Sequence, residues 1–183
     1  MSRRVVITGL GAVTPIGTGV EAFWKAAVAG TDGIAALTCI DTKDFRTKVG
    51  GEVRDFDARR WLSPAEIASM GRGSQFACAA ASMAAADAGL DMAKQDPRRT
   101  AVSLGTTMGE PQILEQAIQI KYGSSADAIP AGLPRQYPCG VICANVARRF
   151  GVMGPVLMIP TACAAGNYAL GYAGDPIKTG GRK

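Results

Sequence analysis

Residues 156–166 read VLMIPTACAAG, and this stretch decides the architecture around it. The apolar run 156–159 is short and closed by Pro160, which predicts a buried strand. The small residues that follow predict a helix over 163–173. A buried strand that turns sharply into a helix beginning at a cysteine has the construction of a nucleophile elbow.

The chemistry of this stretch centres on Cys163. The positive end of a helix stabilises a thiolate, and small neighbours such as Ala162 and Ala164 let an acyl chain approach the sulfur. The backbone N–H of Cys163 is also placed to help bind an oxyanion. Buried cysteines in alanine-rich helices are, however, common and inert. These residues taken alone therefore leave open whether Cys163 is a nucleophile or a packing residue.

A long helix is predicted after Ser63, because Ser63 is suited to cap it, Pro64 to begin it and Glu66 to complete a capping box. The helix is expected to continue to its stop at Gly89. Residues 76–88 are almost all apolar or small, so this part of the helix is predicted to be buried on all sides.

Strands and helices alternate along the rest of the chain, which favours an α/β layered fold. The polar, glycine-rich tail 174–183 is expected to be poorly ordered. The other elements are predicted as strands over 3–8 and 100–104, a possible short strand over 48–53, helices over 20–29, 111–121 and 138–150, and a loop over 123–134.

The composition is that of an ordinary globular protein of 183 residues, with 48% hydrophobic and 19% charged residues. The net charge of +5 comes from scattered doublets such as Arg59-Arg60, not from a basic stripe, so no nucleic-acid partner is expected. No apolar run is long enough for a membrane span, and residues 5–7 are too few for a signal peptide. We therefore expect a cytoplasmic setting.

The chain has five cysteines, and an odd number without a secretory signal argues against a disulfide framework. Cys139 and Cys143 are four residues apart and could share a helix face, but the chain has no histidine to complete a zinc site. We predict core packing for this pair and no metal site.

Several stretches occur in an order and at a spacing that resemble the 3-oxoacyl-[acyl-carrier-protein] synthases of the type II kind, which are thiolase-like condensing enzymes. They are RVVITGLGAVTPIG at 4–17, FW at 23–24, GTDGI at 30–34, AAADAGL at 84–90 and TACA at 161–164. The resemblance covers nearly the whole chain. It implies the N-terminal half of a thiolase-like fold over residues 1–173, with a mixed sheet, covering helices and a buried alanine-rich helix.

The resemblance also implies a function, namely acyl transfer followed by decarboxylative Claisen condensation in fatty acid or polyketide synthesis. Cys163 would accept the acyl group from an acyl carrier protein, and no cofactor is implied. Met108 and Thr107 would border the substrate together with Ala162 and Ala164, although Met108 is equally well explained as a core methionine.

The chain departs from the family pattern in what it lacks. The family's second half supplies two histidines and a lysine to the active site, and this chain contains no histidine. We therefore expect the isolated chain to accept an acyl group at most, and to need a homodimer or a partner subunit that supplies the missing half. A lone half is also expected to expose apolar surface and to associate.

Smaller departures concern two surfaces. Pro160 stands where the family has a small polar residue, which leaves the turn geometry open. Residues 65–69 lack the basic side chains with which the family docks its carrier protein, while Arg59, Arg60 and Arg72 lie nearby in the sequence.

Two other functions compete with this interpretation. Gly9-Leu10-Gly11 follows a predicted strand as in a dinucleotide fingerprint, but Thr14 stands where the third glycine is required. A decayed or truncated condensing-enzyme half that serves as a non-catalytic scaffold would have the same sequence features. A chain-length-factor-like role is disfavoured, because those proteins resemble this family without the cysteine.

Overall fold

Two parallel strands form the centre of the computed structural model, which describes residues 3–180. β5 (Val102–Gly105) lies beside β6 (Val156–Ile159), with Val102 opposite Val156 and Gly105 opposite Ile159. Because the strands are parallel, the chain must cross over between them, and the segments that leave β5 and β6 start from the same edge. Both strands confirm the sequence prediction.

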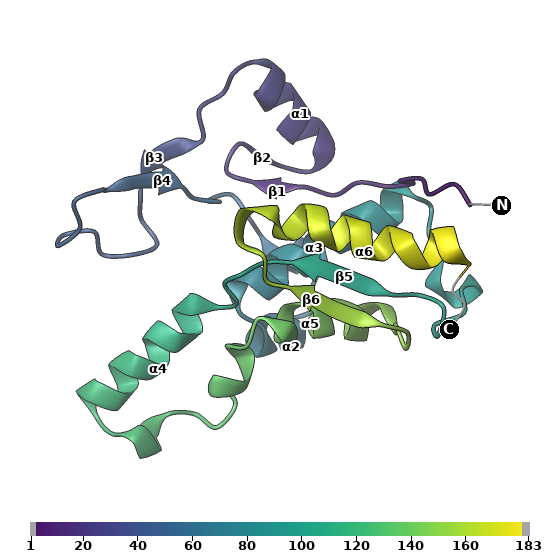
Figure 1. Ribbon diagram of the computed structural model, residues 1–183. Coiled ribbons are helices and arrows are strands. Elements are labelled where there is room, and N and C mark those ends of the chain that lie inside the picture. The colour runs from purple at the N-terminus through teal and green to yellow at the C-terminus, as the bar shows by residue number, and fades with distance from the viewer. Residues whose placement is uncertain (1–2, 181–183) are drawn as a thin grey trace.

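Helices cover this strand pair. α6 (Ala165–Thr179) packs against β5 and β6, and α5 (Gly140–Phe150) packs against the same strands. In Figure 1, α6 runs above the pair and α5 below it, while α3 (Arg72–Asp87) packs on α5. The result is the predicted layered α/β arrangement.

The long helix predicted from Ser63 to Ala88 is in fact two helices. α2 (Pro64–Ser69) begins with the predicted capping box between Ser63 and Glu66, but the backbone becomes extended at Met70 and Gly71 before α3 starts. The break has a physical reason, since the amino terminus of α3 is occupied by the Glu110 carboxylate. The predicted stop at Gly89 is confirmed, with Gly89 at φ 60°.

Burial of α3 is less complete than the sequence predicts. Cys78 and Ala79 are fully buried, and Cys78 joins a core cluster with Leu62, Met70 and Val146. The later part of the helix is only half-buried, and Asp87 is exposed. The apolar composition of α3 therefore exceeds what the described residues can cover.

The amino-terminal segment does not form the strand predicted over residues 3–8. Within residues 3–180 no other strand pairs with it, and Val6 and Ile7 are 69% and 71% exposed. The segment instead lies along α3, where a Cβ on Gly9 would come within 2.1 Å of the carbonyl oxygen of Ala84. A β-branched run becomes a strand only where a sheet edge is available to pair with it.

The glycines of this segment therefore serve close packing against a helix. Gly11 makes the same kind of approach, to the carbonyl oxygen of Ala80. No strand precedes Gly9 and Gly11 within residues 3–8. No helix follows them directly, because β1 (Val13–Thr14) comes next and pairs with β2 (Gly17–Thr18). The strand-turn-helix context that a dinucleotide fingerprint requires is thus absent from residues 3–19.

Two small units extend from the body (Figure 1). α1 (Val20–Val28) confirms the first predicted helix. β4 (Val49–Gly51) confirms the possible strand in shorter form, and it pairs antiparallel with β3 (Ile34–Ala36), a partner that the sequence did not suggest.

α4 (Pro111–Gly123) confirms the helix predicted after β5, and it contains no buried residue. The loop predicted over 123–134 contains the short 3-10 turn Ala126–Ala128, and a second 3-10 turn, Pro134–Gln136, begins at its last residue. Two further 3-10 turns are Ala58–Arg60, before α2, and Met92–Lys94, after α3.

The predicted tail is helical over most of its length, because α6 continues through Gly174 to Thr179 and ends at Gly180 with φ 79°. The expected disorder from Gly174 is therefore wrong as far as Gly180, and residues 181–183 lie outside the described part. Among residues 3–180, no helix combines the length and the apolar character needed to cross a lipid bilayer.

Candidate functional site

The turn between β6 and α6 has the strained geometry of a nucleophile elbow. β6 ends at Ile159, a 3-10 turn spans Ala162–Ala164, and α6 follows without a gap. Ala162 has φ 49°, and within residues 3–180 it is the one residue other than glycine with positive φ. Such a conformation costs about 1–3 kcal/mol and persists where the surrounding structure enforces it, which is common at active sites.

Cys163 lies in the middle of this turn and is exposed. The helix proper begins two residues later than the sequence predicts, at Ala165, with Cys163 in the turn that leads into it. The sulfur therefore sits at the amino end of a 15-residue helix, where the helix dipole favours a negative charge. An exposed thiol at such a position is available to an electrophile.

Three of the other four thiols are held in their neutral form. Burial raises the pKa of Cys78 to about 11 and also raises the pKa of Cys143. The pKa of Cys39 is raised first by its hydrogen bond to Glu52. Cys139 stands at the N-cap of α5 but is half-buried, so Cys163 is distinguished by being exposed at the start of a helix.

β5 brings a second loop to the same edge. A Cβ on Gly105, the last residue of β5, would lie 2.1 Å from the carbonyl oxygen of Ala165, so strand and helix touch through their backbones. Ser103 adds a hydrogen bond of 2.8 Å from its Oγ to the carbonyl oxygen of Ala169. The loop that leaves Gly105 therefore begins next to the first turn of α6.

This loop carries the two residues predicted to border the substrate. Thr107 and Met108 are exposed, and Met108 has 61% of its surface accessible, so it is not a core methionine here. Thr106 stabilises the loop by donating from its Oγ1 to the carbonyl oxygen of Met108 at 2.8 Å. The predicted set Cys163, Ala162, Ala164, Thr107 and Met108 is thus gathered at the carboxyl edge of β5 and β6, and its role in substrate binding stays a prediction.

Sequence reasoning missed Glu110, the most deeply buried charged group near this edge. It is 1% exposed and accepts hydrogen bonds from the backbone N–H groups of Gly73 at 2.9 Å and Ser74 at 2.7 Å. Its position between Gly109 and Pro111 indicates a helix start, which is correct for α4. No local signal predicts that its side chain reaches α3.

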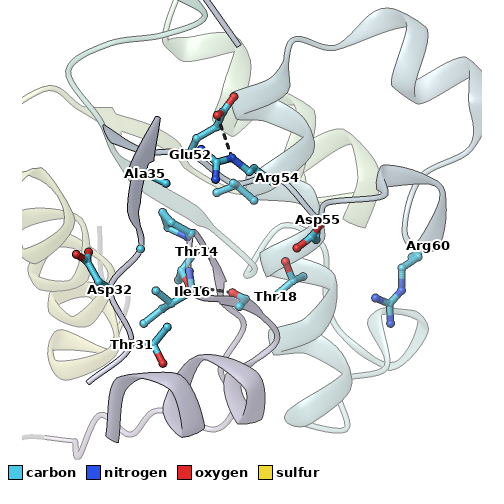
Figure 2. Close-up of a pocket in the computed structure, with 14 residues that line it drawn as sticks. Thr14, Ile16, Thr18, Thr31, Asp32, Ala35, Glu52, Arg54, Asp55 and Arg60 are labelled. Carbon is cyan, nitrogen blue, oxygen red and sulfur yellow. Dashed lines mark hydrogen bonds and ion pairs between the residues drawn. The ribbon is translucent and has the colours of Figure 1, made fainter. Parts of the chain in front are cut away.

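Two cavities lie elsewhere. A polar cavity of about 470 Å³ separates the β1–β2 hairpin from the β3–β4 hairpin, and Figure 2 shows Glu52 and Arg54 joined there by an ion pair of 3.3 Å. An apolar cavity of about 290 Å³ lies beside α3 and α5. Neither is lined by Cys163 or Met108, so we place the chemistry at the elbow and not at the larger hollow. The polar cavity is lined by Thr14, Pro15, Ile16, Gly17, Thr18, Thr31, Asp32, Gly33, Ala35, Glu52, Val53, Arg54, Asp55 and Arg60.

Glu52 uses its charge to tie the β3–β4 hairpin together. It accepts from the backbone N–H and the hydroxyl of Thr38, both at 3.0 Å, and pairs with Arg54, which also donates to the carbonyl oxygen of Ala36. Burial acts to raise its pKa, but hydrogen bonds from Thr38, Cys39 and Arg54 outweigh burial and lower the pKa from 4.5 to about 2.

We expect Glu52→Gln to destabilise the protein at neutral pH, with an effect that fades in acid. A carboxyl whose pKa is depressed on folding stabilises the folded state above its unfolded pKa, and the benefit is lost as pH falls from 4.5 towards 2. Urea midpoints of the two proteins should therefore differ at pH 7 and converge through that window. Glu115→Gln, which removes an exposed charge on α4, should leave the urea midpoint unchanged at both pH values. A difference between the parent and Glu52→Gln midpoints that is the same at pH 7 and in acid would contradict the prediction.

Comparisons with known proteins identify the family of this chain. The family described as "Beta-ketoacyl synthase, N-terminal domain" matches residues 2–183. The granaticin polyketide putative beta-ketoacyl synthase 1 of Streptomyces violaceoruber is 37% identical over 187 residues, which cover 98% of this chain and 44% of that protein. The 3-oxoacyl-[acyl-carrier-protein] synthase 2 of Synechocystis sp. is 36% identical over 180 residues, 97% of this chain and 43% of that protein.

Solved structures give the same result. The ishigamide ketosynthase/chain length factor superposes with a TM-score of 0.92 and 36% identity, over 99% of this chain and 45% of that one. The chain therefore spans less than half the length of the relatives it matches here. The predicted thiolase-like half-fold is confirmed, except that the strands of residues 3–180 form three separate pairs where one mixed sheet was predicted. This chain belongs to the beta-ketoacyl synthase family, whose N-terminal domain it represents.

Proposed function

We propose that this chain carries the acyl-accepting part of a 3-oxoacyl-[acyl-carrier-protein] synthase, with Cys163 as the nucleophile. The single observation that carries the proposal is an exposed cysteine in a strained elbow at the start of a long helix. Family membership supports the same residue, because the elbow lies inside the matched region.

The proposed reaction has two halves. The Cys163 thiolate attacks the carbonyl carbon of an acyl thioester on a carrier protein, the C–S bond to pantetheine breaks, and pantetheine leaves as its thiolate. A malonyl thioester then loses CO2, and the resulting carbanion attacks the acyl-enzyme carbonyl. The C–S bond to Cys163 breaks, which releases a 3-oxoacyl thioester and restores the thiolate. The backbone N–H groups of the elbow are suited to the negative oxygen that forms in both halves.

The second half of this reaction needs groups that the chain does not contain. It has no histidine, so none of its side chains titrates near neutral pH in its ordinary state. We propose that a further segment or partner subunit supplies these groups, which fits relatives more than twice as long. We also infer a cytoplasmic setting, supported by five cysteines that are all free thiols.

An acyl carrier protein is the proposed partner. The name of the Synechocystis relative supports the carrier-bound substrate. The exposed corner formed by the 3-10 turn Ala58–Arg60 and the start of α3 presents guanidinium groups to an acidic surface. Arg59 is already paired with Asp57 at 2.8 Å, and Arg72 both stacks on Phe76 at 4.8 Å and donates to the carbonyl oxygen of Val53. Arg60 stacks on Trp61 at 5.1 Å, but its side chain has no ion pair or hydrogen bond among the described residues, so it is the group most available for docking.

The proposal is tested by incubating the 183-residue chain with octanoyl-pantetheine and mapping the product by peptide mass spectrometry. We expect one octanoyl thioester, on the peptide that contains Cys163. Equal labelling of several cysteines, or none, would favour the non-catalytic scaffold, which shares the fold but needs no reactive thiol.

Exposed apolar side chains on α6 and β6 lead to a separate prediction. Tyr168 and Tyr172 are exposed on one side of α6, Leu170 is exposed on another side, and Leu157 is exposed on β6. We propose that the rest of the synthase covers these side chains, and that the isolated chain covers them by association. Light scattering should give a mass above that of a monomer, and Leu170→Gln with Tyr172→Gln should lower it. A monomer that does not bind a hydrophobic dye would contradict this.

A further inference from the structure

Glu110 is a buried carboxylate for which the proposed reaction has no use. Its side chain is 1% exposed, and among residues 3–180 it forms no ion pair. Burial of a charge without a counter-charge is costly unless strong hydrogen bonds replace the lost water. The cost indicates that the position of this carboxylate matters.

The carboxylate is held by the amino terminus of α3. Its Oε2 accepts from the N–H of Gly73 at 2.9 Å and its Oε1 from the N–H of Ser74 at 2.7 Å, so both oxygens bind backbone donors at the positive end of the helix. α3 has no capping side chain of its own, because Gly71 stands at its N-cap. The cap comes from a residue more than thirty positions away, at the end of the β5–α4 loop.

The sequence leaves room for this long-range cap. A Cβ on Gly71 would lie 2.4 Å from Cδ of Glu110, although the backbone of Gly71, at φ −68° and ψ 169°, suits any residue. A serine or aspartate at position 71 could cap α3 locally, as Ser63 caps α2. Glycine there instead preserves the space that Glu110 occupies.

The anchored loop is the one that borders the elbow. It starts at Gly105, which is pressed against Ala165 of α6, and it ends at Glu110. Next to the anchor, a Cβ on Gly109 would come within 2.4 Å of the carbonyl oxygen of Tyr137, so the backbone packs closely there, and the N–H of Glu110 donates to the same oxygen at 3.4 Å. Thr107 and Met108 lie between the two fixed ends, exposed at the edge that carries Cys163.

We propose that Glu110 is a positioning residue for the acyl chain. By capping α3 from the end of the loop, it fixes where Thr107 and Met108 stand relative to Cys163, and so which acyl groups the thiol accepts. This inference rests on the proposed function of Cys163. It assigns to Glu110 no contact with the substrate, only control of the loop that borders it.

The experiment compares the rates at which acetyl-pantetheine and octanoyl-pantetheine acylate the 183-residue chain, measured by intact mass. Glu110→Gln keeps the shape of the side chain but turns an NH2 group towards a backbone N–H. The side chain at position 110 therefore loses one of its two hydrogen bonds to α3. We expect the octanoyl-to-acetyl rate ratio to change by about tenfold, the order of effect that a small misplacement of a substrate-bordering group produces, while the acetyl rate stays within about twofold.

A second variant perturbs the anchor without changing the Glu110 side chain itself. Gly71→Ala displaces Glu110 from the other side and should shift the ratio in the same direction, whereas Glu115→Gln removes an exposed charge from α4 and should leave the ratio unchanged. Circular dichroism checks that each variant is folded, and if Glu110→Gln does not fold, Gly71→Ala provides the comparison.

The outcomes separate the two proposals. If the parent chain is acylated at Cys163 and neither variant changes the ratio, or if both rates fall together with the folded fraction, Glu110 is only a helix cap and this inference is overturned. If the parent chain is not acylated at Cys163 by either thioester, the proposed function fails and the inference fails with it.

Discussion

Replacing Cys163 by serine is expected to reduce acylation of the chain by octanoyl-pantetheine by roughly three orders of magnitude, because a hydroxyl is far less readily ionised than a thiol and no base stands by to activate it. The fold should be unaffected, since Cys163 is exposed and serine has nearly the same shape. The measurement is the rate of the mass shift in the intact protein, with urea unfolding to confirm equal stability.

Two other cysteines offer matched comparisons. Cys39 is exposed like Cys163, but it lies on the loop after β3 and its thiol is hydrogen-bonded to Glu52. Cys139 is half-buried at the N-cap of α5. Serine at either position should leave the acylation rate within about twofold of the parent, because neither thiol lies in a strained turn before a long helix. A Cys163→Ser protein that still acquires one acyl group at the parental rate would place the nucleophile elsewhere.

The elbow could be predicted from the sequence because its signals are local. An apolar run ends at Pro160, and the small residues around Cys163 permit a tight turn and a helix. The capping box at Ser63 and the stop at Gly89 were predicted for the same reason, since each depends on residues three or four apart. The strain at Ala162 adds a feature that only coordinates reveal.

What the sequence could not show depends on distant partners. Residues 5–7 have strong strand propensity, yet no strand within residues 3–180 pairs with them. Gly71 and Gly73 weaken the predicted helix, but the neighbouring residues still favour helix across Met70 and Gly71. The break there is explained by Glu110, which fills the space before α3. Long-range contacts of this kind leave no periodic signal.

The second large effect is expected at Gly105, where alanine should destabilise the protein by about 3 kcal/mol or more, at the upper end of what an added methyl group costs in a packed core. The added Cβ would lie 2.1 Å from the oxygen and 2.2 Å from the carbon of the Ala165 carbonyl group. Both are backbone atoms, which cannot rotate away as a side chain could. β5 and α6 would have to separate, and the hydrogen bond of 2.8 Å between Ser103 and Ala169 would weaken.

Gly105→Ala should also slow acylation of the molecules that remain folded, because Ala165 is only two residues from Cys163 and the elbow moves with it.

Gly171→Ala separates this effect from a general intolerance of alanine. Gly171 lies in the same helix, but beyond its neighbours and the local helix backbone no atom lies within 4 Å of where its Cβ would stand. Alanine there should therefore leave stability equal or raise it by up to about 1 kcal/mol through better helix propensity. Urea unfolding of the two variants, with acylation rates normalised to folded protein, decides the matter. If Gly105→Ala matches the parent in both, β5 and α6 are not in backbone contact, and the elbow is held in place by some other element.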